Sequence, residues 1–219
     1  IDSGGFAMRL PSVLLLLVVA TSAHAFRFSE EEAKARAEAD AGKVAAIEIS
    51  PACRKRLGGE RVLLLIAERG NSGINAEQSR YSLHFNGIEK RLRGYGMRTY
   101  SQAEIKRQIA QAEIDAHFRN DPDAALAAAK KLGATLILRG MISSQRGINP
   151  VLKINEVAVN MGFSLQGGGK SLADVDARAD SYSGTDTVGM ALKLIDEQAD
   201  DVVNRLVAGY CAARGDKKK

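Results

Sequence analysis

The stretch from Asn120 to Ser144 constrains the fold most, because it has the pattern of a helix, a stop and a buried strand. Asp121 can cap the helix, and Pro122 suits the first helical position, where its missing N–H costs nothing. Gly133 stands where helices commonly end in a left-handed residue. The run from Ala134 to Ile142 then predicts a core strand.

The N-terminal region has the pattern of a secretory signal peptide. Residues 1–7 precede Met8, the first credible start, and we expect them to be untranslated or cloning-derived. Residues 8–25 contain an arginine, the apolar run Val13–Ala20 and small residues suited to cleavage before Phe26. A membrane anchor is the alternative, but that run is about half of the roughly 20 residues a spanning helix needs. The sequence therefore predicts an exported, periplasmic protein that does not span the membrane after cleavage.

The charge of the chain is a modest +5, and Lys217–Lys219 supply three of these charges. Nucleic acid or acidic lipid would require a clustered basic face, for which a sequence gives no direct sign. We therefore expect no nucleic-acid partner.

Cys53 and Cys211 are the two cysteines of the chain. An even count in an exported protein favours a disulfide over a thiol nucleophile or a metal site. Two free thiols remain the alternative.

The predicted domain organisation follows from composition. Residues 26–59 form a charged helical extension and linker, in which Ser29–Ala46 has too few large apolar residues to bury much surface. Turn residues punctuate it at Ser50-Pro51 and Gly58-Gly59. Residues 60–211 form the periplasmic domain, and residues 212–219 form a polar tail.

Periodicity predicts the elements of that domain. Arg61–Ala67 is an unbroken apolar strand, followed by a loop over Glu68–Ala76 and a helix over Glu77–Arg93. That helix has one apolar stripe, consisting of Tyr81, Phe85, Ile88 and Leu92. Met97–Tyr100 is a short strand. A capping box at Ser101–Glu104 starts a helix that is expected to reach His117 and to point Ile105, Ile109 and Ala112 inward.

After the Asn120–Ser144 unit, two segments alternate between apolar and polar residues. They predict an antiparallel hairpin over about Val157–Gln166 and Ala173–Asp180, and a helix over about Thr185–Cys211 is expected to cover the sheet. The predicted fold class is α/β (α+β), a single two-layer or three-layer domain with an N-terminal helical extension. Its mixed sheet has about five strands, in the order β-α-β-α-α-β-β-β-α.

Candidate chemistry is sparse. Gly167–Ser171 resembles the end of a phosphate-binding loop, but Ser164 replaces a required glycine and a strand pattern follows, so a hairpin turn is favoured. Asp174, Asp176 and Asp180 alternate along a strand, which favours a solvated face over a calcium loop. His84 and His117 lie on different helices without neighbouring ligands. We therefore predict no catalytic, cofactor-binding or metal residues and no cofactor.

The order of elements, with Tyr100–Ile105 and Ala128–Gly140, resembles the core of the curli-secretion-subunit-like periplasmic domains, which share an anticodon-binding-domain-like fold. This group includes the penicillin-binding-protein activator lipoprotein, the middle domain of flagellar assembly protein T and the N-terminal domain of TolB. The resemblance spans roughly Arg61–Cys211. Lipid-anchored members have a lipidated cysteine, which this chain lacks at the end of its leader.

The resemblance implies a non-enzymatic adaptor or assembly factor that contacts envelope proteins of the outer-membrane, cell-wall or flagellar machinery, with self-association left open. The alternative is a small-ligand binding module or an uncharacterised periplasmic hydrolase that uses the loop Glu68–Asn75. Loops at the carboxyl end of a strand often carry ligand contacts, although their commoner role is to turn the chain.

Overall fold

The computed structural model describes residues 48–119, 121–148, 151, 153, 155–182 and 186–215. The predicted leader and the predicted helix over Ser29–Ala46 lie outside these residues. No helix in the described part of the chain combines the length and the apolar character needed to cross a bilayer.

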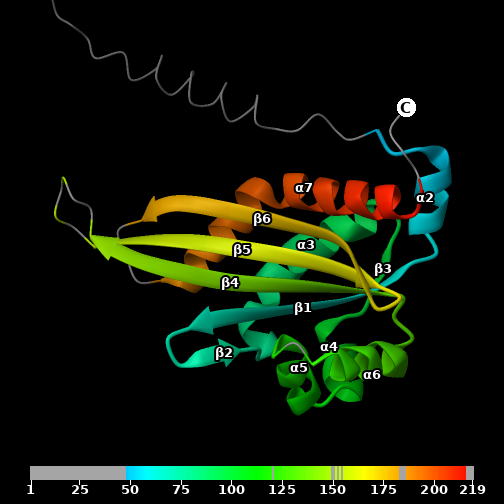
Figure 1. Ribbon diagram of the computed structural model, residues 1–219, viewed down its shortest axis with the longest axis horizontal. Coiled ribbons are helices and arrows are strands. Elements are labelled where there is room, and N and C mark those ends of the chain that lie inside the picture. The colour runs from blue at the N-terminus through cyan, green and yellow to red at the C-terminus, as the bar shows by residue number, and fades with distance from the viewer. Residues whose placement is uncertain are drawn as a thin grey trace, which may run out of the picture. The chain divides into compact units, whose positions relative to one another are not determined.

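A mixed sheet forms the centre of the domain, in the order β2-β1-β4-β5-β6, and β3 pairs with β1 (Figure 1). Its strands are β1 (Arg61–Gly70), β2 (Gly73–Asn75), β3 (Arg98–Thr99), β4 (Leu136–Ile148), β5 (Asn155–Gly167) and β6 (Lys170–Tyr182). β1 pairs in parallel with β3 and β4, whereas the β1–β2, β4–β5 and β5–β6 pairs are antiparallel. The predicted α/β class with a mixed sheet is confirmed.

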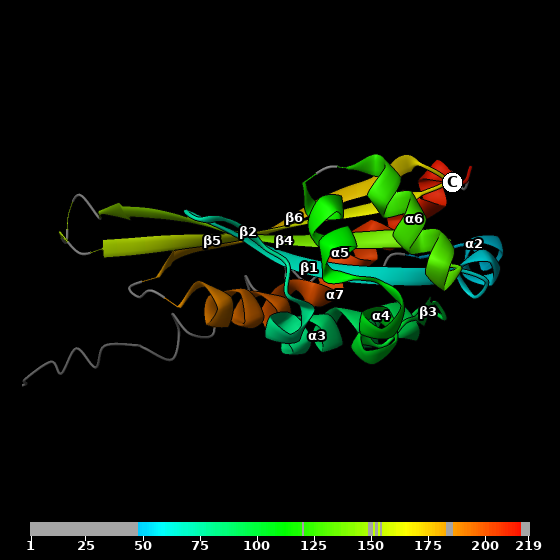
Figure 2. The same cartoon turned by 90° about the horizontal axis from the view of Figure 1, so that it is seen from below.

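Helices cover the sheet on both faces, so the domain has three layers. α3 (Ser82–Gly94) and α7 (Thr187–Ala213) lie on one face, and α5 (Gln111–Phe118) and α6 (Pro122–Leu132) lie on the other (Figure 2). This arrangement explains why Val62–Ala67 of β1 are all buried. A strand covered on both faces has an apolar side chain at every position instead of at alternate ones.

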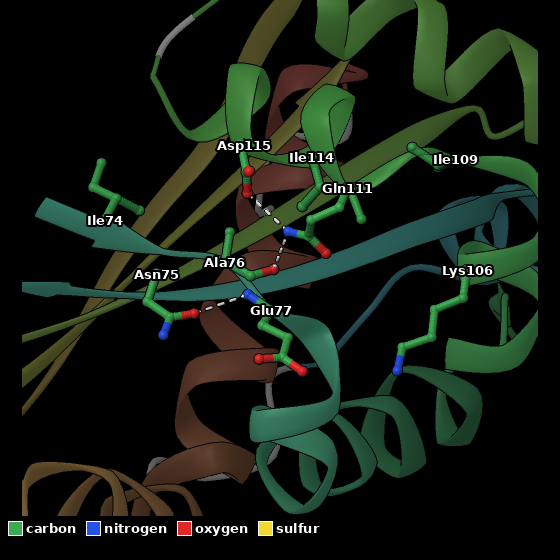
Figure 3. Close-up of a pocket in the computed structure, with 9 residues that line it drawn as sticks. All are labelled: Ile74, Asn75, Ala76, Glu77, Lys106, Ile109, Gln111, Ile114 and Asp115. Atoms are coloured by element: carbon green, nitrogen blue, oxygen red, sulfur yellow. Dashed lines mark hydrogen bonds between the residues drawn. The ribbon is translucent and has the colours of Figure 1, made fainter.

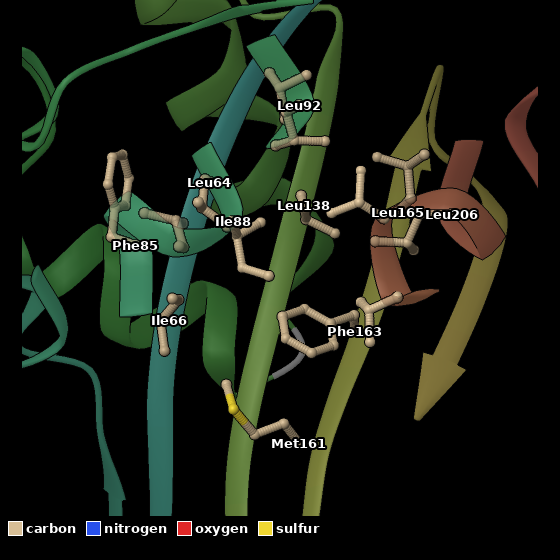
Figure 4. Close-up of a cluster of buried hydrophobic side chains, with 14 of the residues drawn as sticks. Leu64, Ile66, Phe85, Ile88, Leu92, Leu138, Met161, Phe163, Leu165 and Leu206 are labelled. Carbon is tan, nitrogen blue, oxygen red and sulfur yellow. The ribbon is translucent and has the colours of Figure 1, made fainter. Parts of the chain in front are cut away.

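The main core lies between the sheet and the α3–α7 layer. Phe85, Ile88 and Leu92 of the predicted stripe lie on α3, with Tyr81 directly before it, and all four are buried in this core together with the odd-numbered residues of β5 (Figure 4). The members of that β5 stripe are Val157, Val159, Met161, Phe163 and Leu165, each at most 3% exposed. The predicted period-2 alternation of β5 is therefore confirmed.

The predicted cap and stop of α6 are also confirmed. The Asp123 N–H donates to Asp121 Oδ1 at 3.0 Å, which satisfies one of the free donors at the start of the helix. Gly133 follows the helix with a φ of +68°, a conformation that glycine adopts without the steric cost of a Cβ. The strand that follows begins at Leu136, two residues later than the sequence predicts.

Four sequence expectations differ from the structure. The predicted loop Glu68–Ala76 is mostly strand, because β1 continues to Gly70 and β2 returns antiparallel to it. The helix predicted from Ser101 to His117 is two helices, α4 (Gln102–Gln108) and α5, because Ile109 adopts an extended conformation. Ala112 is consequently exposed and does not point inward. The first turn of the helix predicted at Glu77 is the 3-10 helix η1 (Gln78–Tyr81).

A short helix, α2 (Pro51–Leu57), occupies the space between the two predicted turns at Ser50-Pro51 and Gly58-Gly59. Its buried residues, Cys53 and Leu57, are part of the main core. A disulfide joins Cys53 to Cys211 near the end of α7, with the Cα atoms 5.7 Å apart. The bond spans 158 residues and so ties the start of the described domain to its last helix.

Candidate binding cleft

An open cleft of about 730 Å³ lies beside β2, the strand at one end of the sheet order (Figure 3). Its walls come from the end of β2 and the following turn, from α4, and from α5. The lining residues are Ile74, Asn75, Ala76, Glu77, Lys106, Ile109, Gln111, Ile114 and Asp115.

The break between α4 and α5 builds one wall of this cleft. The Ala110 N–H donates to Glu113 Oε2 at 3.0 Å, which caps the new helix start. Restarting the helix at Gln111 places Gln111, Ile114 and Asp115 along the cleft. In a single helix from Ser101 to His117, the helical period would have set the directions of these three side chains relative to α4, and the break at Ile109 changes those directions.

Gln111 connects the two walls. Its Nε2 donates to the Ala76 carbonyl at 3.0 Å and to Asp115 Oδ1 at 2.7 Å. On the opposite wall, the Glu77 N–H donates to Asn75 Oδ1 at 3.0 Å. The polar groups around the cleft are therefore held by hydrogen bonds within the protein.

The lining of the cleft combines apolar and charged side chains. Ile109 and Ile114 are buried and Ile74 is half-buried, so the lining includes apolar surface. Lys106 and Glu77 are exposed and add one positive and one negative group. None of the nine lining residues is a serine, threonine, cysteine or histidine. The lining therefore offers no hydroxyl, thiol or imidazole group, on which Ser–His, Cys–His and Thr-based nucleophile–base pairs depend.

The predicted ligand loop contributes only its last two residues, Ile74 and Asn75, to the cleft. Glu68, at its start, lies in a separate polar junction between β1, η1 and α7. The Thr187 hydroxyl donates to Glu68 Oε1 at 2.7 Å, and Arg80 forms an ion pair with Glu68 Oε2 at 3.3 Å. Glu68 therefore joins elements of the scaffold.

The two histidines of the described residues, His84 and His117, are buried in separate places. His84 Nε2 lies 2.9 Å from the Val188 carbonyl, and burial lowers the pKa of this imidazole. His117 lies on α5, and burial, assisted by the positive charge of Arg139, lowers its pKa to about 4. In both residues, burial favours the neutral form of the imidazole over the charged form.

The other candidates are surface features of the sheet. The Gly167–Ser171 stretch contains the β5–β6 turn, where Gly168 and Gly169 have φ values of +60° and +75°, as a two-residue hairpin turn requires. Asp174 and Asp176 are exposed on β6. Within the described ranges, no group of three or more histidine, cysteine, aspartate or glutamate side chains could hold a metal ion.

Sequence reasoning missed the part of the cleft that comes from α4 and α5. The pattern around Ile109 has neither proline nor glycine, so nothing marks a helix end there. Glu113, three residues after Ala110, is the one available signal, since a glutamate at this spacing can accept a bond from the backbone N–H of the capping position.

No family model matches the chain, and no curated protein matches it. Among solved structures, it is similar to a PelC dodecamer from Paraburkholderia phytofirmans, at 18% identity and a TM-score of 0.40, over 68% of this chain and 88% of that one. Lipoprotein GNA1162 from Neisseria meningitidis has 12% identity and a TM-score of 0.40, over 65% and 99%. The LpoB C-terminal domain from Salmonella enterica has 17% identity and a TM-score of 0.30, over 59% and 93%. These values assign no family, and the family resemblance drawn from the sequence stays a prediction.

Proposed function

We propose that this protein is a periplasmic adaptor or assembly factor that binds an extended segment of an envelope protein in the cleft beside β2. The observation that carries the proposal is the cleft itself, which joins apolar side chains, one positive group and two negative groups next to an outer strand. Peptides commonly bind along such strands, with their side chains in adjacent pockets.

Two features support the compartment. The sequence has the pattern of a secretory signal peptide over residues 8–25. The disulfide between Cys53 and Cys211 is a bond that persists in oxidising compartments such as the periplasm.

The cleft is tested by charge substitutions at two lining residues, the half-buried Ile74 and the exposed Lys106. Ile74→Glu places a carboxylate in the apolar part of the lining, and Lys106→Glu reverses the charge of the lining lysine. We expect both to abolish capture of the same envelope protein by the immobilised mature chain, followed by at least a tenfold loss of affinity for that protein once purified.

Matched controls come from α3. Leu83→Glu changes an apolar residue that is 64% exposed, and Lys90→Glu reverses an exposed lysine, both outside the cleft lining. These variants should bind like the unmodified chain. If the cleft variants and the α3 variants retain identical proteins with equal affinity, the cleft is not the binding site.

A small-ligand site is the second candidate, since clefts of about 300–1,000 Å³ are typical of such sites. Thermal shifts across a panel of metabolites and metal ions separate the two, because a ligand that binds only the folded state raises its melting temperature. A shift that disappears in Ile74→Glu and persists in Leu83→Glu would favour the ligand over the peptide.

A further inference from the structure

The fold gathers the positive charge of the chain at one end of the domain. Nine basic residues lie on five short segments there, namely Arg54, Lys55, Arg56, Arg61, Arg98, Lys130, Lys131, Lys170 and Arg214. We call these nine residues the basic end. The same segments, residues 48–61, 96–100, 130–135, 168–170 and 212–215, contain two acidic residues, Glu48 and Glu60. Since the whole chain carries +5, its remainder is net negative.

Several contacts bring these segments together. Arg61 and Arg98 are direct neighbours in the β1–β3 register. The Arg61 guanidinium lies against Gly133 at the end of α6, next to Lys130 and Lys131. The disulfide holds α2 against the end of α7, where Arg214 lies over the Tyr210 ring at 5.6 Å.

The sheet register adds Lys170 to this end. Leu136, the first residue of β4, lies opposite Gly167, which in turn lies opposite Lys170. Figure 1 shows α2, β3, the β5–β6 turn and the C-terminal end of α7 together on the right of the molecule.

These basic side chains face solvent, because all nine residues are exposed. Glu113 pairs with Lys131, and the Tyr210 hydroxyl donates to Glu60 at 2.5 Å. Lys55, Arg98 and Lys130 form no ion pair within the described part of the chain. The positive charges of these three residues are therefore not neutralised by ion pairs within the described chain.

We propose that the basic end binds an anionic membrane surface through lipid phosphates. Its charges are spread over five segments and do not converge on one cavity, which suits many headgroups better than one bound anion. Basic clusters near anionic lipid bind in this way without crossing the bilayer.

The mode of binding is electrostatic. The exposed large apolar residues of the described chain, Leu83, Ile148 and Val151, lie on α3 and around the β4–β5 connection, not among the nine basic residues. Binding through charge alone is screened by salt, since the screening length falls from about 10 Å at 0.1 M salt to about 3 Å at 1 M.

Vesicle flotation of the mature chain, Phe26–Lys219, tests the proposal. The probes are vesicles of phosphatidylethanolamine and phosphatidylglycerol, with pure phosphatidylcholine vesicles as the neutral comparison. The variant Lys55→Gln/Arg98→Gln/Lys130→Gln removes three unpaired charges from three different elements. At about 1 kcal/mol for each basic residue, the loss in partitioning is expected to be at least about 10-fold, up to about 100-fold.

The matched control is Lys90→Gln/Arg107→Gln/Lys193→Gln, which removes the same net charge from exposed positions elsewhere. It should float like the unmodified chain in 0.1 M salt, and binding by both should vanish at 1 M salt. Circular dichroism and melting temperature confirm that each variant is folded. Equal flotation with neutral vesicles, or equal losses in both triple variants, would overturn the proposal. Binding to a soluble polyanion such as polyphosphate without vesicle flotation would also overturn it.

Discussion

The side chain of Gln78 pairs with the main chain of Ile66 as a neighbouring strand would. Gln78 Oε1 accepts the Ile66 N–H at 3.0 Å, and its Nε2 donates to the Ile66 carbonyl at 2.8 Å and to the Ala76 carbonyl at 2.7 Å. Ile66 lies in the part of β1 between the residues that pair with β3 and the residues that pair with β2. An exposed row of backbone groups there would invite pairing with another chain, and Gln78 covers part of it.

Replacing Gln78 with alanine should destabilise the protein by about 2–4 kcal/mol, because it leaves buried backbone groups without partners. Gln78 is 1% exposed, so water cannot easily replace the lost amide. Urea unfolding of Gln78→Ala measures the change. The exposed Gln108→Ala is the control and should shift stability by less than about 0.5 kcal/mol. Equal stabilities for the two variants would show that the strand-like pairing contributes little.

The packing of α3 on α7 depends on the absence of a side chain at Gly87. A Cβ there would approach Ile195 Cγ2 to 2.7 Å, and Ile195 is a stiff, buried, β-branched residue. Gly87→Ala should therefore cost about 1–3 kcal/mol despite the higher helix propensity of alanine.

Gly94 on the same helix provides the matched control, since a Cβ at Gly94 meets nothing within 4 Å. Gly94→Ala should leave stability unchanged or raise it by up to about 1 kcal/mol. Chemical unfolding of the two variants side by side gives the comparison. If both alanine variants are stabilised equally, α3 and α7 do not approach each other at Gly87 as closely as described.

Much of the architecture could be predicted because its signals are local. The α6 cap at Asp121, the stop at Gly133 and the alternation of β5 each depend on a few neighbouring residues. The start of α5 has only one such signal, Glu113 three residues after Ala110, and no proline or glycine marks the break at Ile109. The loop composition over Gly70–Gly73 hid β2, because a three-residue strand is too short for a periodic pattern.

The cleft and the basic end could not be predicted for a different reason. Each depends on residues far apart in the sequence, such as Ile74 with Ile114, or Arg61 with Arg98. The sequence indicated only a modest net charge, but the register of β1 with β3 and the disulfide bring basic residues from separate segments together. Composition reports how many charges a chain has, whereas only the fold reports how they are grouped.

The disulfide between Cys53 and Cys211 should contribute about 5 kcal/mol in the chain-entropy model, given its separation of 158 residues. The variant Cys53→Ser/Cys211→Ser should therefore unfold at lower urea concentration and lose the packing of α2. Limited trypsin digestion should then cleave faster at Arg54–Arg56, since these residues flank Cys53.

Dithiothreitol provides the control for this prediction. It should sensitise the unmodified protein to trypsin and leave the double variant unchanged. Equal digestion of oxidised and reduced protein would contradict a role for the bond in holding α2.

Burial of His117 should make the protein less stable in acid. The residue is 3% exposed, and its pKa is lowered to about 4, compared with about 6.5 in the unfolded chain. Above pH 6.5 both states are neutral and the full stability is present. As the pH falls from 6.5 to 4 the unfolded state takes up a proton that the folded state does not, which costs roughly 3 kcal/mol at most.

His117→Leu should reduce this loss, because leucine does not titrate and fills an apolar site. Urea unfolding at pH 7.5, 6, 5 and 4.5 gives the slope for both proteins. A smaller slope should remain in the variant, since burial also lowers the pKa of His84. Identical slopes between pH 6.5 and 4.5 would mean that His117 does not carry the acid sensitivity. A reduced slope in the variant would show that protonation of this buried imidazole on α5 accounts for part of the loss of stability in acid.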